Sequence, residues 1–359
     1  MIINEIKKEF KCTTFTICQP WKQQYVFNIS ENNDITEWTE ISEPNLPGFL
    51  TFPEAVITKN RAYLLGGLNI YKVSKKVYTA IIDESGVLGE WIETDPLPEP
   101  LYNFQAFVIK NYLYLFGGNN GRYNLNTIYK SKIKHDGTLG DWIKEQPLPL
   151  KVVGTKIIVT GNYIYVLGGD TGDGITRLIY RAKIYSKGDI GVWKEYDFLP
   201  AELSHYQVIF TNNYLYLLGG YSVFNHRVGI SKSIYRAKIS ENGILGKLTE
   251  VGFLPDYLAF FQAIVTRNKV YLLGGDNEHD AIDSIYAAKI YPDGTLGNWR
   301  VSGSLPYHLL NFQVITTKNY IYLLGGMKMS KTKEKIELNS CVLRANFSGG
   351  LNDYSSFYS

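Results

Sequence analysis

The chain has 359 residues, of which 45% are hydrophobic and 14% aromatic, and 37 Lys and Arg against 34 Asp and Glu give a formal net charge of +3. So small a positive excess disfavours a dedicated nucleic-acid binder, which carries a strong basic footprint. The 28 tyrosines, set against 3 methionines, favour strands over helices because aromatic rings pack well on a pleated surface. An all-β protein is expected.

The N-terminus, MIINEIKKEF, carries charges where a cleaved signal peptide has its apolar stretch, and no later run is long enough to span a membrane. The three cysteines, Cys12, Cys18 and Cys341, match neither a zinc spacing nor the dense framework of a small secreted domain. We therefore expect free thiols, no signal peptide, no membrane span, and a place in the cytoplasm or in a virion.

The first 45 residues contain part of a unit that recurs later in the chain. Tyr25 and Trp38 stand at the same spacing as Tyr129 and Trp142 in a later unit. This first unit has no glycine pair, so its inner strands have to come from residues 1–20, where KCTTFTICQ is the candidate. A separate blade at the N-terminus is therefore predicted.

An apolar strand that ends in a glycine pair then appears six times. The second glycines of these pairs lie 51, 51, 51, 55 and 51 residues apart. The strands are AYLLGG ending at Gly67, LYLFGG at Gly118, IYVLGG at Gly169, LYLLGG at Gly220, VYLLGG at Gly275 and IYLLGG at Gly326. Self-similarity at a fixed period indicates a repeat architecture rather than two globular domains.

Each of the first five glycine pairs is followed by a strand with a tyrosine, then by a turn and a further strand. The tyrosines are Tyr78, Tyr129, Tyr180, Tyr235 and Tyr286; the later strand carries Trp91, Trp142, Trp193 and Trp299, with Leu248 in one unit. Sequences such as DGTLGDW place Asp-Gly between strands, which is a strong hairpin signal. Four short strands per period predict the blades of a propeller.

The glycine pair followed by Tyr and then Trp resembles the Kelch repeat, and the resemblance covers nearly the whole chain. It implies a β-propeller in which these tyrosines and tryptophans pack between blades. It implies little about activity, because Kelch propellers serve as adaptors, actin binders, sugar mutarotases and oxidase scaffolds.

We predict one all-β, Kelch-like β-propeller domain over residues 1–359 with seven four-stranded blades. The blades lie roughly at 1–45, 46–97, 98–148, 149–199, 200–254, 255–305 and 306–359. In the last blade CVLRANF supplies the third strand, and LNDYSSF offers Tyr354 near the missing Trp position. Six blades are the alternative, in which the N-terminal strands complete the last blade.

The connections after the glycine pairs and the Leu-Pro connections should emerge on one common face of the propeller. Their length and chemistry vary on a fixed scaffold, which favours recognition at this loop face. Aromatic and cationic side chains there are candidates for binding a protein or a glycan. They are Arg122, Tyr123, Tyr221, Phe224, His226, Arg227, Tyr257, Tyr307 and His308. The alternative is that the loop tyrosines cover blade edges.

A polar residue recurs thirteen positions before each second glycine, at the predicted start of the inner strand. The six are Glu54, Gln105, Lys156, Gln207, Gln262 and Gln313. This polar ring either lines the mouth of the central channel and binds something there, or satisfies backbone groups where the inner strands converge. The structural interpretation is preferred.

The histidines do not predict a metal site. His205, His226, His279 and His308 fall on or beside the loop face, but no two stand at ligand spacing and they belong to several blades. We expect no metal and no cofactor.

These patterns predict a non-catalytic binding or scaffold propeller whose partner is a protein or a glycan. One alternative is a structural component of a larger assembly such as a phage virion, suggested by a composition rich in Ile, Lys, Asn and Tyr. Another is an enzyme resembling a sugar mutarotase or epimerase, which needs a carboxylate facing a base. Glu54 with Lys156 is the ring pair that offers this, and no nucleophile motif stands beside it.

Overall fold

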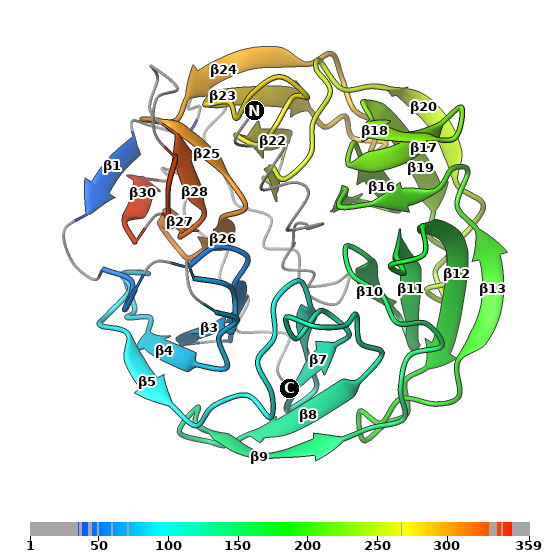
Figure 1. Ribbon diagram of the computed structural model, residues 1–359. Coiled ribbons are helices and arrows are strands. Elements are labelled where there is room, and N and C mark those ends of the chain that lie inside the picture. Colours follow the sequence, from blue (N-terminus) through cyan, green and yellow to red (C-terminus); the bar gives the residue numbers. More distant parts are fainter. Residues whose placement is uncertain are drawn as a thin grey trace.

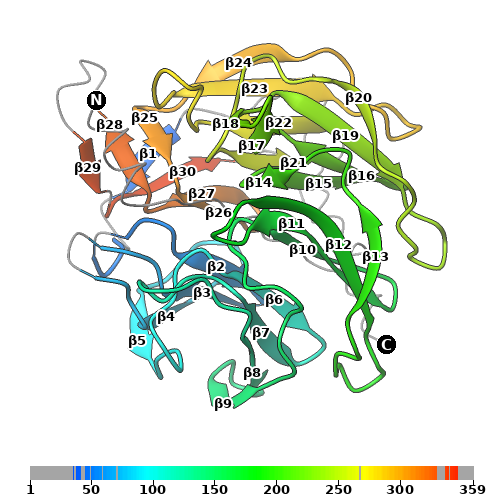
Figure 2. The ribbon, with the colours of Figure 1, turned by 45° about the vertical axis from the view of Figure 1, so that its right-hand side comes forward.

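The computed structural model describes residues 35, 38–41, 45–48, 50–58, 60–69, 72–266, 268–329, 336–338 and 340–346. All regular secondary structure in these residues is β. Six four-stranded antiparallel sheets stand around a ring as the blades of a propeller (Figure 1). The oblique view in Figure 2 shows neighbouring blades stacked against one another.

In the first five blades the strands run from the inner to the outer edge in chain order. The first blade contains β2 (Glu54–Ile57), β3 (Arg61–Leu65), β4 (Val77–Ile81) and β5 (Ile92–Thr94). The second contains β6 (Gln105–Ile109), β7 (Tyr112–Phe116), β8 (Ile128–Ile133) and β9 (Leu139–Lys144). The third contains β10 (Lys156–Thr160), β11 (Tyr163–Asp170), β12 (Ile175–Lys183) and β13 (Lys194–Phe198).

The fourth blade contains β15 (Gln207–Thr211), β16 (Tyr214–Leu218), β19 (Ser233–Lys238) and β20 (Thr249–Phe253). The fifth contains β21 (Gln262–Val265), β22 (Lys269–Leu273), β23 (Ser284–Lys289) and β24 (Arg300–Ser304). The sixth contains β26 (Gln313–Thr316), β27 (Tyr320–Leu324), β30 (Val342–Asn346) and, at its outer edge, β1 (Trp38–Ile41).

The two inner strands of each blade are buried along nearly their whole length, as β10 and β11 show. A blade is covered by a neighbour on both faces, so its inner strands are apolar runs rather than alternating ones. The outer strands, such as β13 and β20, are mostly exposed. The tyrosine and tryptophan of the repeat pack against the hydrophobic clusters between neighbouring blades. Tyr129 and Trp142 are an example.

Each glycine pair forms a junction with the next blade. Both glycines have positive φ; Gly219 and Gly220 have φ of 59° and 83°. The amide of Gly220 donates a hydrogen bond of 2.8 Å to the carbonyl of Leu258 in the next blade. A Cβ added at Gly219 would lie 2.5 Å from that same carbonyl oxygen, so only glycine permits the approach.

A buried tyrosine in the second strand joins neighbouring blades at the opposite edge of the ring. The hydroxyl of Tyr216 donates a hydrogen bond of 3.0 Å to the carbonyl of Gly294, which lies in the turn before the outer strand of the next blade. The same contact recurs in four other blades: Tyr63 with Gly137, Tyr114 with Gly188, Tyr165 with Gly243 and Tyr322 with Gly86. These second-strand tyrosines were not among the residues predicted to pack between blades.

The described residues close the ring with six blades, so the seven-blade count is not confirmed and the six-blade alternative describes the structure. The strand of Trp38 pairs with β30 and completes the last blade instead of beginning a blade of its own. Strand β2 contacts β26 and β6, which leaves no place for a further blade between the last and the first. The amide of Gly326 donates to the carbonyl of Leu50 across this seam. Residues 1–34 and Tyr354 lie outside the described residues.

The tyrosine contact predicts a measurable loss of stability. Changing Tyr216→Phe keeps the ring and removes the hydroxyl that joins two blades, so we expect the free energy of unfolding to fall by about 1 kcal/mol. Urea denaturation followed by tryptophan fluorescence measures the change. Tyr214→Phe is the matched control, because the Tyr214 hydroxyl makes no hydrogen bond with the described residues, and an equal loss in both variants would refute the assignment.

Candidate partner-binding face

A hairpin rises from the fourth blade on the side of the ring where the glycine pairs end. Strands β17 (Tyr221–Phe224) and β18 (Arg227–Ile230) are joined by Asn225 and His226, whose φ angles of 47° and 63° are those of a type I′ turn. Strand β14 (Leu203–Ser204) pairs with β17 and completes a small three-stranded sheet. The tip at 224–227 is exposed, with 49% of Phe224 accessible to solvent.

The base of this hairpin is packed into the molecule. The ring of Tyr221 meets the rings of His205 and Phe260, with centroid distances of 5.9 and 5.5 Å. Burial raises the pKa of Tyr221, and the nearby carboxylates of Asp276 and Glu278 add to the shift. Burial also lowers the pKa of His205 well below its usual range, with the charge of Lys156 as the second cause. Tyr221 therefore anchors the hairpin.

The second blade carries another exposed tip, at 120–123. The side-chain oxygen of Asn120 accepts hydrogen bonds of 3.1 Å from the amides of both Arg122 and Tyr123. These bonds hold the turn while its side chains point to solvent, and Tyr123 is 69% exposed. Asparagine favours such turns because its side chain imitates a backbone carbonyl.

The other candidates of the loop face are covered to different degrees. Tyr257 is 39% exposed and has the Nζ of Lys232 4.9 Å from its ring centroid. Tyr307 is buried, with the Nζ of Lys328 3.9 Å from its ring centroid. His308 begins β25 (His308–Leu310), which pairs with β28 (Met327–Met329), and it is half-buried. Strand β29 (Ile336–Leu338) completes this second small sheet. Tyr307 thus belongs to a buried hydrophobic cluster and not to the exposed part of the loop face.

The polar ring at the start of the inner strands is fully buried: Glu54, Gln105, Lys156, Gln207, Gln262 and Gln313 are at most 2% exposed. Three of its side chains bond the backbone of the next blade beside the next ring member. Glu54 accepts from the amide of Ala106 at 3.1 Å, Gln207 donates to the carbonyl of Phe261 at 2.6 Å and Gln262 donates to that of Phe312 at 2.8 Å. These contacts agree with the structural interpretation of the ring.

A second ring, which the sequence analysis missed, lies two residues before the polar one. Its members have positive φ in every blade: Phe52, Asn103, Gly154, His205, Phe260 and Asn311. Backbone hydrogen bonds join some neighbours, such as the 2.8 Å bond from the amide of His205 to the carbonyl of Gly154. The His205 ring occupies the space that a Cβ at Gly154 would need. Because these positions hold four different residue types, Phe, Asn, Gly and His, no recurring residue in the sequence marks them.

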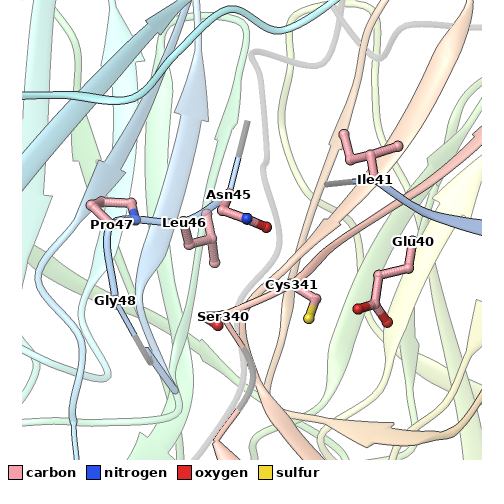
Figure 3. A pocket seen from close by; sticks show the side chains of 8 residues that line it. All are labelled: Glu40, Ile41, Asn45, Leu46, Pro47, Gly48, Ser340 and Cys341. Carbon is pink, nitrogen blue, oxygen red and sulfur yellow. The ribbon is translucent and has the colours of Figure 1, made fainter. Parts of the chain in front are cut away.

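A hollow lies at the seam where β1 meets β30, and Figure 3 shows its lining side chains. Cys341 is one of the lining residues. Burial is the main cause that raises the pKa of its thiol to about 11, and the neighbouring carboxylate of Glu40 adds to the shift. The thiol therefore stays protonated at neutral pH, and the thiolate rather than the thiol is the nucleophile. The residues that line the hollow therefore include no activated cysteine.

Within the described residues, no three His, Cys, Asp or Glu side chains come together as metal ligands. His226 and His279 are exposed on loops of different blades, whereas His205 is buried. The described part of the chain also contains no helix that could cross a membrane.

No family model matches the sequence. Among curated relatives, the chain is 27% identical to Kelch-like protein 40b of Danio rerio over 121 residues, which cover 32% of this chain and 19% of that protein. It is 25% identical to Kelch repeat and BTB domain-containing protein 2 of Cowpox virus (strain Brighton Red) over 136 residues, covering 38% and 23% of the two chains. With Kelch-like protein 25 of Rattus norvegicus it shares 24% identity over 243 residues, covering 66% and 38%.

The matched region spans about a fifth of the length of the first of these relatives. Among solved structures, that of YjhT matches with a TM-score of 0.61 and 15% identity over 82% of this chain and 99% of YjhT, a likeness in fold alone. The ring of four-stranded blades is a β-propeller, and the repeat motif and these relatives support a Kelch-repeat propeller.

Replacing the buried carboxyl of Glu54 should increase the free energy of unfolding, and the size of the increase should depend on pH. Burial raises its pKa well above the ordinary 4.5, although the amide of Ala106 and the charge of Lys156 act in the opposite direction. Above the unfolded pKa, the folded state therefore still holds the proton that the unfolded chain has lost. The contribution of Glu54 to stability is fully present below the unfolded pKa and is lost as pH rises.

Glu54→Gln removes this loss and copies the glutamine found at four other ring positions. We expect the variant's advantage in free energy of unfolding to grow between about pH 4.5 and pH 8. Urea denaturation at both pH values measures it, with the exposed Glu90→Gln as control. An advantage that is the same at both pH values would show that Glu54 does not titrate as described.

Proposed function

We propose that this propeller is a non-catalytic binding module that recognises a protein partner through its loop face. The contact surface consists of the two loop tips, at 120–123 and 224–227. The main support for this proposal is that both tips expose an aromatic ring and an arginine. The backbone of each tip is held by turn hydrogen bonds or by strand pairing. Tyr123 is the most exposed of the large hydrophobic side chains in the described residues.

Exposed aromatic and arginine side chains are the residue types that contribute most at protein interfaces. A tip that is already ordered loses little conformational entropy when a partner binds, which increases affinity. The Kelch resemblance supports this role, because adaptors are among the proteins built on this propeller. The differing loops on repeated blades are what a recognition surface requires.

The geometry gives less support to a sugar enzyme. Such an enzyme needs a carboxylate and a base within reach of a substrate. Glu54 and Lys156 are fully buried, and the Glu54 carboxyl already accepts a hydrogen bond from the backbone of the next blade. The contact of Glu54 therefore favours a role in joining blades over proton transfer.

We expect partner binding to depend on the two exposed rings. In a pull-down from the native source, Tyr123→Ser combined with Phe224→Ser should reduce retained partner by at least about tenfold, since each ring contributes buried apolar area. Phe253→Ser is the matched control, because Phe253 is 57% exposed in the same blade but lies on the outer strand.

Equal retention by wild type and the double variant would contradict a binding role for the loop tips. A glycan array run in parallel separates the glycan alternative. Glycan binding that is lost in the double variant, with no retained protein, would make the chain a carbohydrate reader instead. Stable recovery of the chain in a large particle would favour the structural component of an assembly.

A further inference from the structure

We propose that the loop face recognises carboxylate groups of its protein partner, with Arg122 and Arg227 as the two contact points. This inference rests on the proposed function and specifies the chemistry of the partner: a surface or segment that presents Asp or Glu beside apolar side chains. It follows from what the arginines of the chain are bonded to.

Most described arginines are held by the fold itself. The Nε of Arg61 donates to the carbonyl of Asp136 at 2.9 Å. Four others lie over aromatic rings: Arg177 over Phe198, Arg181 over Tyr163 and Tyr196, Arg236 over Tyr214 and Arg344 over Tyr320, at 4.4 to 5.2 Å from the ring centroids. Arg300 also takes part in an interaction. These guanidinium groups serve as structural contacts.

Arg122 and Arg227 differ from all of these. Within the described residues, neither guanidinium has an ion pair, a hydrogen bond or a ring contact, and both side chains are exposed. Both follow a glycine pair, in the second and fourth blades, and so emerge on the same side of the ring. The arginines with no partner are therefore the ones at the two loop tips.

No carboxylate of the described residues forms an ion pair with the arginine of either tip. Segments 119–127 and 221–232 contain no Asp or Glu. The carboxylate that reaches the first segment, Glu99, accepts hydrogen bonds from Asn120 and Tyr129 at 3.3 and 2.9 Å. The one that reaches the hairpin, Glu278, accepts from the amide of Ile230 at 3.1 Å. Both carboxylates are committed to backbone or side-chain contacts that shape the loops.

A guanidinium with no partner selects for an anion of matching shape. Its planar fork of donors pairs with both oxygens of a carboxylate, and such charge-assisted pairs are stronger than neutral hydrogen bonds. Tyr123 follows Arg122 in the sequence, and Phe224 is paired with Arg227 across the hairpin, so each arginine has a ring beside it that provides apolar contact for a neighbouring residue of the partner. Two isolated cations on a chain of net charge +3 fit discrete protein carboxylates better than a nucleic-acid backbone, which needs a continuous basic surface.

Selection from a random peptide library displayed on phage tests the inference on the full chain. We expect the enriched peptides to carry Asp or Glu next to apolar residues. For the best of them, synthesised with a fluorophore, polarisation titrations should show that Arg122→Gln and Arg227→Gln each weaken binding about tenfold. Lysine at either position should restore binding only in part, because it cannot form the paired contact.

Arg177→Gln is the matched control, since Arg177 is exposed in the third blade but its guanidinium is held by the Phe198 ring, and we expect it to bind as wild type does. Enriched peptides without acidic residues, or acidic peptides indifferent to both arginines, would overturn the inference. If such peptides still lose binding in the Tyr123→Ser, Phe224→Ser variant, the proposed function stands and only the partner chemistry is wrong. Peptides indifferent to every loop-tip variant, or no enrichment at all, would overturn both.

Discussion

Each glycine pair lets its blade come into close backbone contact with the next one, and the closed ring is built from these contacts. In the fourth blade the amide of Gly220 bonds the carbonyl of Leu258, and the missing side chain of Gly219 lets that carbonyl come close. Repeated around the ring, the contact fixes the spacing of the blades, and between Gly326 and Leu50 it joins the last blade to the first. The tyrosine contacts at the opposite edge, such as Tyr216 with Gly294, hold the same pairs of blades a second time.

The connections after the glycine pairs can differ in length and sequence, because the strands and the contacts between blades hold the propeller together without them. The hairpin of the fourth blade uses that freedom. Tyr221 fixes its base against His205 and Phe260, and a tight turn exposes Phe224 and Arg227 at its tip. Rigid strands that support a short exposed tip are a favourable arrangement for recognition, since ordering costs little on binding. The arginines at the tips, which form no ion pair with the described residues, then suggest that the partner presents carboxylates.

Much of the fold could be predicted from the sequence, because the spacing of the glycine pairs and of the recurring tyrosines gives the length of the repeat. The number of blades could not, since Trp38 carries the local pattern of a blade but pairs with β30, a partner three hundred residues away that no local signal identifies. For the loop face, exposure separates residues that look alike in sequence: Tyr123 points to solvent, whereas Tyr307 is buried under Lys328. Loop tyrosines serve either purpose, and the packing of neighbouring blades decides which.

Hydrogen exchange of the chain alone and bound to a recovered partner tests whether the loop tips form the contact surface. We expect binding to slow exchange of the backbone amides at 119–124 and 221–230 and to leave the turns at the opposite side, around Gly137 and Gly243, unchanged. Slowed exchange confined to those turns, or to exposed outer strands such as β13 and β20, would contradict it and place the partner elsewhere on the propeller.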